Sequence, residues 1–264
     1  MEKVILLVSL FCLAAPAAQA IVQGREVSYR ANGTTLKGYL AWDDSIKGRR
    51  PAVLVVHEWW GRNAYARKRA DMLAGLGYTA LAMDMYGDGR QANHPDEAGK
   101  FAAEVSRNMP LARARFEAGM QLLRKHKTVD AKQLAAIGYC FGGGVVLNMA
   151  RIGADLKGVA SFHGSLGTDS PAQPGKVKAR ILSFSGEDDP MIPADAVAAF
   201  KQEMERAGAD YRVVTYPGVK HSFTNPEADE LGRKFGLPLA YNAEADQDSW
   251  QQATVFLRKA FGEK

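Results

Sequence analysis

Short, continuously apolar segments alternate along the chain with longer segments in which apolar residues recur at helical spacing. Uninterrupted apolar runs are typical of strands buried on both faces of a sheet, and residues 52–56 form the clearest one. The same pattern predicts strands at 78–83, 134–137, 159–162, 180–184 and 211–216. Helices are expected over 64–75, over 95–127 with a break at Pro110, from Pro193 to Gly208, and in a last segment that begins at Asn242.

Two alternating runs, at 27–30 and 36–40, flank Asn32-Gly33, a pair that favours a tight hairpin turn. Over the rest of the chain, strands alternate with helices, which predicts an α/β fold with a mostly parallel central sheet and helices on both faces. No element is predicted for the polar segment 226–241, which could be a lid or surface packing.

The first twenty residues have the organisation of a secretory signal peptide. Lys3 is followed by an apolar run at 4–15 that is too short to span a bilayer comfortably, and Ala18-Gln19-Ala20 matches a cleavage site. A membrane anchor is the alternative. We therefore expect a periplasmic or secreted protein in which 21–264 form a single domain, with no stable membrane insertion after cleavage.

Cleavage would leave Cys140 as the one cysteine of the mature chain. A single thiol cannot form an internal disulfide, so it is either shielded or functional. The net charge of +5 can attract anionic small molecules, whereas the basic run 67–69 lies in a predicted helix and favours a solvated face over nucleic-acid binding. No metal or cofactor is predicted, because the histidines lack ligand spacing and Gly142-Gly143-Gly144 lacks the dinucleotide-binding pattern.

Cys140 stands between glycines in Gly138-Tyr139-Cys140-Phe141-Gly142, after a predicted strand and before a segment that can continue as a helix. A reactive side chain on a strand-to-helix turn is the pattern of a nucleophile elbow, in which glycines avoid collisions in the tight bend. The helix would direct its positive end at the sulfur and so favour the thiolate. The alternative is a small buried side chain in a glycine-rich bend.

A cysteine nucleophile needs a base and an orienting acid, and both follow in the order typical of α/β hydrolases. Asp189 follows the strand at 180–184, and His221 follows the strand at 211–216. Loops at the carboxyl ends of parallel strands meet at one edge of the sheet, so both loops should lie beside Cys140. Taken singly, Asp189 could cap a helix and His221 could lie on the surface. Asp188 could take the acid role instead.

The strand at 52–56 is followed by His57-Glu58-Trp59-Trp60-Gly61. An oxyanion hole usually takes one N–H group from such a loop and one from the residue after the nucleophile, here Trp59 and Phe141. Glu58 would then lie near the sulfur, although a like charge disfavours a thiolate. A structural ion pair between Glu58 and an arginine is the alternative.

Together these motifs resemble the dienelactone hydrolase family, a branch of the α/β hydrolases. The resemblance extends from about residue 53 to the last helix and rests on segments 58–61, 84–86, 138–143, 186–193 and 221–223. It implies the α/β-hydrolase fold, with Cys140 as nucleophile, His221 as base and Asp189 as orienting acid. It also implies that Glu58 pairs with the thiol system until bound substrate disturbs the pair.

Two features differ from family members that act on anionic dienelactones. Those enzymes hold the substrate carboxylate with arginines, one of which lies where this chain has Asn225, while the other corresponds to Arg90 if the loop spacing holds. The expected export is also unlike cytoplasmic pathway enzymes. We expect a hydrolase of a small ester, lactone or thioester that forms a thioester acyl-enzyme, with Arg90, Asn225 and Trp60 contacting substrate. The alternatives are a broad-specificity esterase or thioesterase, and an exported binding or stress-related protein without turnover. No oligomeric state is predicted.

Overall fold

The computed structural model describes residues 21–263, so the predicted signal peptide lies outside the described part of the chain. Asn32 and Gly33 have φ angles of 48° and 83°, as a type I′ hairpin turn requires. They join β1 (Val22–Ala31) to β2 (Thr34–Asp43) in the predicted antiparallel pair. β2 also pairs antiparallel with β4 (Thr79–Ala82), which attaches the hairpin to the rest of the sheet.

The remaining strands are parallel, as predicted. The sheet has the order β1-β2-β4-β3-β5-β6-β7-β8. Its other members are β3 (Arg50–Val56), β5 (Val129–Tyr139), β6 (Gly158–Phe162), β7 (Arg180–Gly186) and β8 (Tyr211–Tyr216). β5 pairs with β3 on one side and β6 on the other, so the strand that leads to Cys140 is central.

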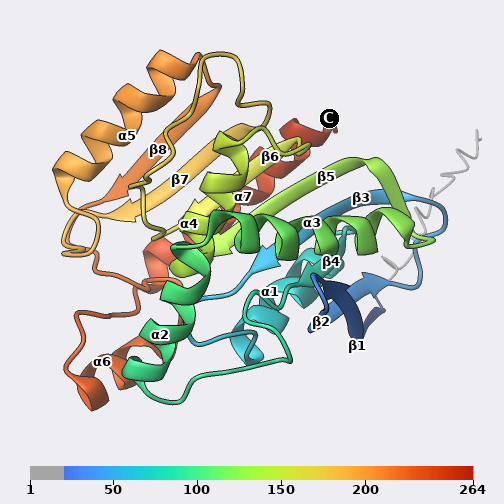
Figure 1. Cartoon of the computed structure of the whole chain (residues 1–264), viewed down its shortest axis with the longest axis horizontal. Helices are drawn as coiled ribbons and strands as arrows, with labels where there is room; N and C mark the ends of the chain where they lie inside the picture. Colours follow the sequence, from blue (N-terminus) through green and yellow to red (C-terminus); the bar gives the residue numbers. More distant parts are fainter. Residues whose placement is uncertain (1–20, 264) are drawn as a thin grey trace, which may run out of the picture.

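Neighbouring residues of the buried strands pack into opposite layers. Leu54 and Val56 belong to the core beneath α2 (Pro95–Ser106), α3 (Met109–Lys125), α4 (Phe141–Arg151) and α5 (Ala194–Ala207). Val53 and Val55 belong to the core beneath α1 (Ala64–Gly75) and α7 (Ala243–Phe261). Figure 1 shows α3, α4 and α5 in front of the sheet and α1 and α7 behind it. Both faces are covered, which explains the uninterrupted apolar runs.

The helical segment over 95–127 is not broken at Pro110. Arg107 is the C-terminal cap of α2, and Asn108 caps α3 by accepting a hydrogen bond from the N–H of Leu111 at 3.0 Å. Pro110 lies in the first turn of α3, where a missing N–H group costs nothing because it would have no partner in the helix. The prediction of a break at Pro110 was therefore wrong, and the break precedes it.

An additional helix, α6 (Ala228–Phe235), lies in the polar segment for which no element was predicted. Acidic residues occupy its first turn and basic residues its last turn, which suits the helix dipole, and Gly236 ends it with a φ of 65°. Leu231 and Phe235 pack against the cluster that contains the buried Trp60. Much of this segment is therefore packed structure.

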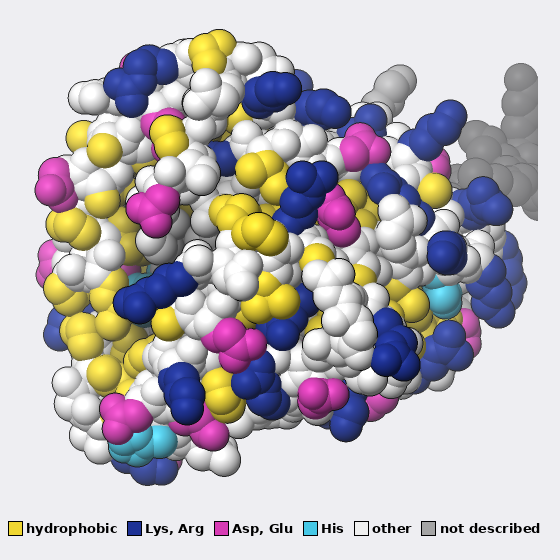
Figure 2. Space-filling view, in the orientation of Figure 1, with side chains coloured by type: hydrophobic (Ala, Val, Ile, Leu, Met, Phe, Trp, Pro, Cys, Tyr) yellow, Lys and Arg dark blue, Asp and Glu magenta, His cyan; other side chains and the backbone are white. Residues whose placement is uncertain are grey.

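The surface carries both signs of charge. On the face shown in Figure 2, Lys and Arg side chains are interspersed with Asp and Glu side chains. Among residues 21–263, no helix combines the length and apolar character needed to cross a bilayer.

Candidate active site

Cys140 occupies the turn between β5 and α4, with φ 51° and ψ −116°. A positive φ is uncommon outside glycine and marks a strained backbone. An added Cβ on Gly138 would lie 2.1 Å from the carbonyl oxygen of Gly142, and one on Gly142 would lie 2.3 Å from that of Val56. Only glycine fits at either position, so the predicted elbow geometry is present.

The backbone of Cys140 is held by two acceptors. Its N–H group lies 3.0 Å from the carbonyl oxygen of Phe162 and 3.1 Å from Nδ1 of His163. A backbone N–H can only donate, so Nδ1 is an acceptor and the proton of the neutral ring is on Nε2, which lies 2.8 Å from Oγ1 of Thr224. Burial lowers the pKa of His163 well below its usual value, and this favours the same neutral form. The sequence patterns do not indicate this contact.

Asp189 and His221 are both buried and lie in direct contact. Nδ1 of His221 is 2.7 Å from Oδ2 of Asp189, while Oδ1 of Asp189 accepts a hydrogen bond from the N–H of Met191 at 2.8 Å. Asp188 is exposed. Of the two adjacent acids, Asp189 is therefore the one that orients the ring.

The other ring nitrogen of His221, Nε2, is buried and has no hydrogen-bond partner within the described part of the chain. Cys140, which is half-buried, lines the same cavity as His221. Burial opposes protonation of the ring, but the negative charges of Cys140 and Asp189 and the hydrogen bond to Asp189 outweigh it and raise the pKa of His221 to about 10. The protonated form of the His221 ring is thus favoured near neutral pH.

Glu58 is buried in the same region but is held by other residues. Its Oε1 accepts a hydrogen bond from Oγ of Ser222 at 3.0 Å, and its Oε2 accepts one from Nδ2 of Asn225 at 2.6 Å. Burial raises the pKa of Glu58, and these two hydrogen bonds act in the opposite direction. Among residues 21–263, Glu58 has neither the expected hydrogen bond to Cys140 nor an ion pair with an arginine. The loop that follows His221 supplies its partners instead.

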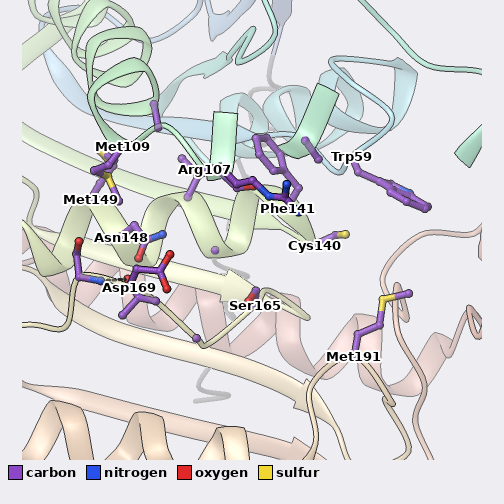
Figure 3. A pocket seen from close by; sticks show the side chains of 18 of the residues that line it. Trp59, Arg107, Met109, Cys140, Phe141, Asn148, Met149, Ser165, Asp169 and Met191 are labelled. Carbon is purple, nitrogen blue, oxygen red and sulfur yellow. Dashed lines mark hydrogen bonds between the residues drawn. The ribbon is translucent and has the colours of Figure 1, made fainter. Parts of the chain in front are cut away.

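A cavity of about 710 Å³ opens beside the elbow (Figure 3). Trp59 and Phe141 both line it. Their backbone N–H groups donate to no acceptor within residues 21–263. Both groups are therefore available to a ligand, as the predicted oxyanion hole requires. Within the described residues, no group of three or more His, Cys, Asp and Glu side chains is arranged to hold a metal ion.

The sequence model of the dienelactone hydrolase family matches residues 36–261. The chain belongs to this family. It is 27% identical over 240 residues to protein usf of Aquifex pyrophilus, a match that covers 89% of this chain and 98% of that protein. It is similar to the solved structure of the dienelactone hydrolase-like promiscuous phosphotriesterase P91 from metagenomic libraries, with 32% identity and a TM-score of 0.83 over 91% of this chain and 99% of that one. A second structure, m3DLH, shows 35% identity and a TM-score of 0.86 at the same coverage.

The resemblance drawn from the motifs is thus confirmed, and this dienelactone hydrolase-like enzyme is a carboxylic ester hydrolase with the α/β-hydrolase fold. The three predicted substrate contacts, however, do not line its cavity. Trp60 is buried against α6, and the buried side chain of Asn225 donates its hydrogen bond to Glu58. The guanidinium of Arg90 donates to the carbonyl oxygen of Tyr86 and forms an ion pair with Glu104 at 3.1 Å. Local packing takes up all three side chains, and their contact with substrate stays a prediction.

Residues that line the cavity without having been predicted include Arg107, Met109, Asn148 and Met149. The α4 members follow Cys140 at helical spacing, since positions 141, 144, 145, 148 and 149 share one helix face. This spacing is visible in the sequence. The contribution of the α2–α3 junction is not, because it depends on how those helices pack over α4.

Proposed function

We propose that this hydrolase cleaves a carboxylic ester, lactone or thioester with Cys140 as nucleophile, His221 as general base and Asp189 as the acid that orients His221. The observation that supports this most directly is the difference between the surroundings of the two ring nitrogens of His221. One nitrogen is fixed by a buried carboxylate, while the other is unpartnered and shares a cavity with the cysteine. This is the arrangement that activates a nucleophile.

In the proposed reaction, Nε2 of His221 takes the proton from Sγ of Cys140, or holds it already in an ion pair with the sulfur, and the thiolate attacks the substrate carbonyl carbon. The carbonyl oxygen becomes an oxyanion that accepts hydrogen bonds from the N–H groups of Trp59 and Phe141. The tetrahedral intermediate then expels the alcohol or thiol leaving group, which receives the proton from His221, and a thioester acyl-enzyme remains. Water, deprotonated by His221, attacks the thioester and releases the acid, and the cysteine thiol is regenerated.

The oxyanion donors carry a large share of the expected acceleration. Loss of one such donor typically costs a factor of about 10²–10³ in kcat. Both donors here are main-chain groups, Trp59 in the loop that follows β3 and Phe141 at the first position of α4, so the backbone sets their positions before substrate binds. A rigid main-chain site of this kind needs no metal ion to polarise the carbonyl.

The acyl-enzyme is the direct test. The wild-type protein is mixed with para-nitrophenyl acetate and quenched in acid within the first turnover. The protein is then digested, and the masses of its peptides are measured by mass spectrometry. An added acetyl group on the peptide that contains Cys140, together with a Cys140→Ala variant that keeps its fold but loses turnover, is the expected result. Undiminished turnover in Cys140→Ala, or acetylation elsewhere, would exclude the mechanism.

We also infer that residues 1–20 direct export, on the basis of the leader pattern in the sequence. N-terminal sequencing of the protein recovered from a native host tests this. A mature chain that begins at Ile21 supports it, and an intact Met1 in the cytoplasmic fraction contradicts it.

A further inference from the structure

The cavity extends well beyond the reacting sulfur. Phe141, Gly144, Val145, Asn148 and Met149 line it along one face of α4. At 1.5 Å of rise per residue, that face carries the cavity about 13 Å along the helix from Cys140. Figure 3 shows Met109 and Met149 together at one end and Cys140 with Met191 at the other. We call the part between Met109 and Val145 the distal arm.

The walls of the distal arm are largely apolar. Opposite α4, the α2–α3 junction contributes Ala102, Met109, Pro110 and Ala112. Methionine side chains are flexible and polarizable, so Met109 and Met149 can adapt to an apolar chain. The polar members of the distal lining are Ser106, Arg107 and Asn148 on the helices and Ser165, Thr168, Asp169 and Ser170 in the loop that follows β6, and both Arg107 and Asp169 are exposed. The arm thus offers an apolar path with a polar, solvent-facing side.

The position of His221 decides which part of a substrate enters the arm. A leaving group must lie where Nε2 of His221 can protonate it, next to Cys140. The distal arm leads away from that point along α4. The acyl part, which stays attached to the sulfur at the start of α4, is therefore the part of the substrate that we assign to the arm.

We propose that the distal arm binds the acyl chain of esters whose acid part is a linear apolar chain, and that such esters are the preferred substrate class of this enzyme. This inference rests on the proposed function of Cys140. A small lactone would leave most of the 710 Å³ unfilled, whereas pockets of this volume usually enclose much larger ligands. A longer acyl chain would displace water from the apolar wall, and the free energy gained by burying this apolar surface would raise kcat/KM.

The test compares kcat/KM for para-nitrophenyl octanoate and para-nitrophenyl acetate in three proteins. The wild type should prefer octanoate by about tenfold or more. Met109→Glu places a charge in the arm at the first turn of α3, where an acid suits the helix dipole and the fold should persist. It should abolish the octanoate preference, so that the ratio of kcat/KM for octanoate to kcat/KM for acetate falls to about one. Leu111→Glu changes a half-buried residue of the same turn that does not line the cavity, and both substrates should react as in wild type.

The outcomes separate the two proposals. If acetate is cleaved through Cys140 but wild type shows no chain-length preference, or if Met109→Glu lowers both rates alike, the acyl-chain assignment is overturned and the proposed function stands. If neither ester is cleaved faster by wild type than by Cys140→Ala, both are overturned together.

Discussion

Replacement of Asp189 by asparagine exchanges one oxygen for an NH₂ group and leaves the shape of the side chain unchanged. Oδ1 accepts the N–H of Met191 at 2.8 Å, so the oxygen that remains will stay there. The NH₂ group then faces Nδ1 of His221, where Oδ2 lies 2.7 Å away in the wild type. Because NH₂ can only donate, the ring must present a bare Nδ1 and carry its proton on Nε2. In this tautomer Nε2 cannot accept the proton of Cys140.

The expected loss in kcat for Asp189→Asn is about 10⁴, as for the same change in a serine triad. This corresponds to about 5–6 kcal/mol of transition-state stabilisation at 1.36 kcal/mol per tenfold. The assay is steady-state hydrolysis of para-nitrophenyl acetate, with circular dichroism to confirm the fold. Asp188→Asn is the matched control, since Asp188 is exposed and should change kcat by less than about twofold.

Two results would refute this reasoning. Folded Asp189→Asn protein with activity near that of wild type would show that the tautomer of His221 is not set by the carboxylate. Equal losses in Asp188→Asn and Asp189→Asn would point to damage of the loop rather than to the hydrogen bond at Nδ1.

Three further changes test the remaining parts of the site. Cys140→Ala removes a negative charge that helps to raise the pKa of His221 to about 10, so NMR titration of the ring should give a lower pKa; an unchanged value would contradict the coupling. The raised pKa also means that protonation of His221 stabilises the folded wild type fully below about pH 6.5 and that this contribution is lost as pH rises through about 10, which urea unfolding at a series of pH values can follow. His163→Leu deletes one acceptor of the Cys140 N–H and should lower kcat more than it raises KM, with about 1–3 kcal/mol of lost stability; an unaltered kcat would show that Phe162 suffices. Gly142→Ala should lower Tm because its Cβ meets the carbonyl of Val56 at 2.3 Å, whereas Gly167→Ala, which enters open space, should not; similar Tm values for both would refute the steric account.

The sheet was predictable because its strands are buried on both faces. Such strands are apolar at every position, whichever helices cover them, so each one is visible as an uninterrupted apolar run. The elbow was predictable because glycines are demanded on either side of Cys140, at Gly138 by a backbone contact within the turn and at Gly142 by the backbone of the neighbouring β3. α6 was missed because its apolar residues are few. Its signal was the order of charge, with acids in the first turn and bases in the last before Gly236.

The surroundings of Glu58 could not be read from the sequence. Ser222 and Asn225 reach it across more than 160 positions of chain, and nothing near residue 58 indicates which loop will cover it. The same holds for Arg90, which has an arginine's capacity to bind a carboxylate but is occupied by the carbonyl of Tyr86 and by Glu104. Local patterns identified which residue types could do chemistry, while long-range packing decided which of them face the cavity.

The strands that precede Cys140 and His221 differ in how firmly they are held in the sheet. Cys140 follows β5, which has a strand on each side, whereas His221 follows β8, an outer strand that pairs with β7 alone among the strands of residues 21–263. Outer strands open at lower free energy than central ones. On warming, the region that carries His221 should therefore open before the region that carries Cys140. Enzymatic activity should then be lost at temperatures at which most of the molecule is still folded.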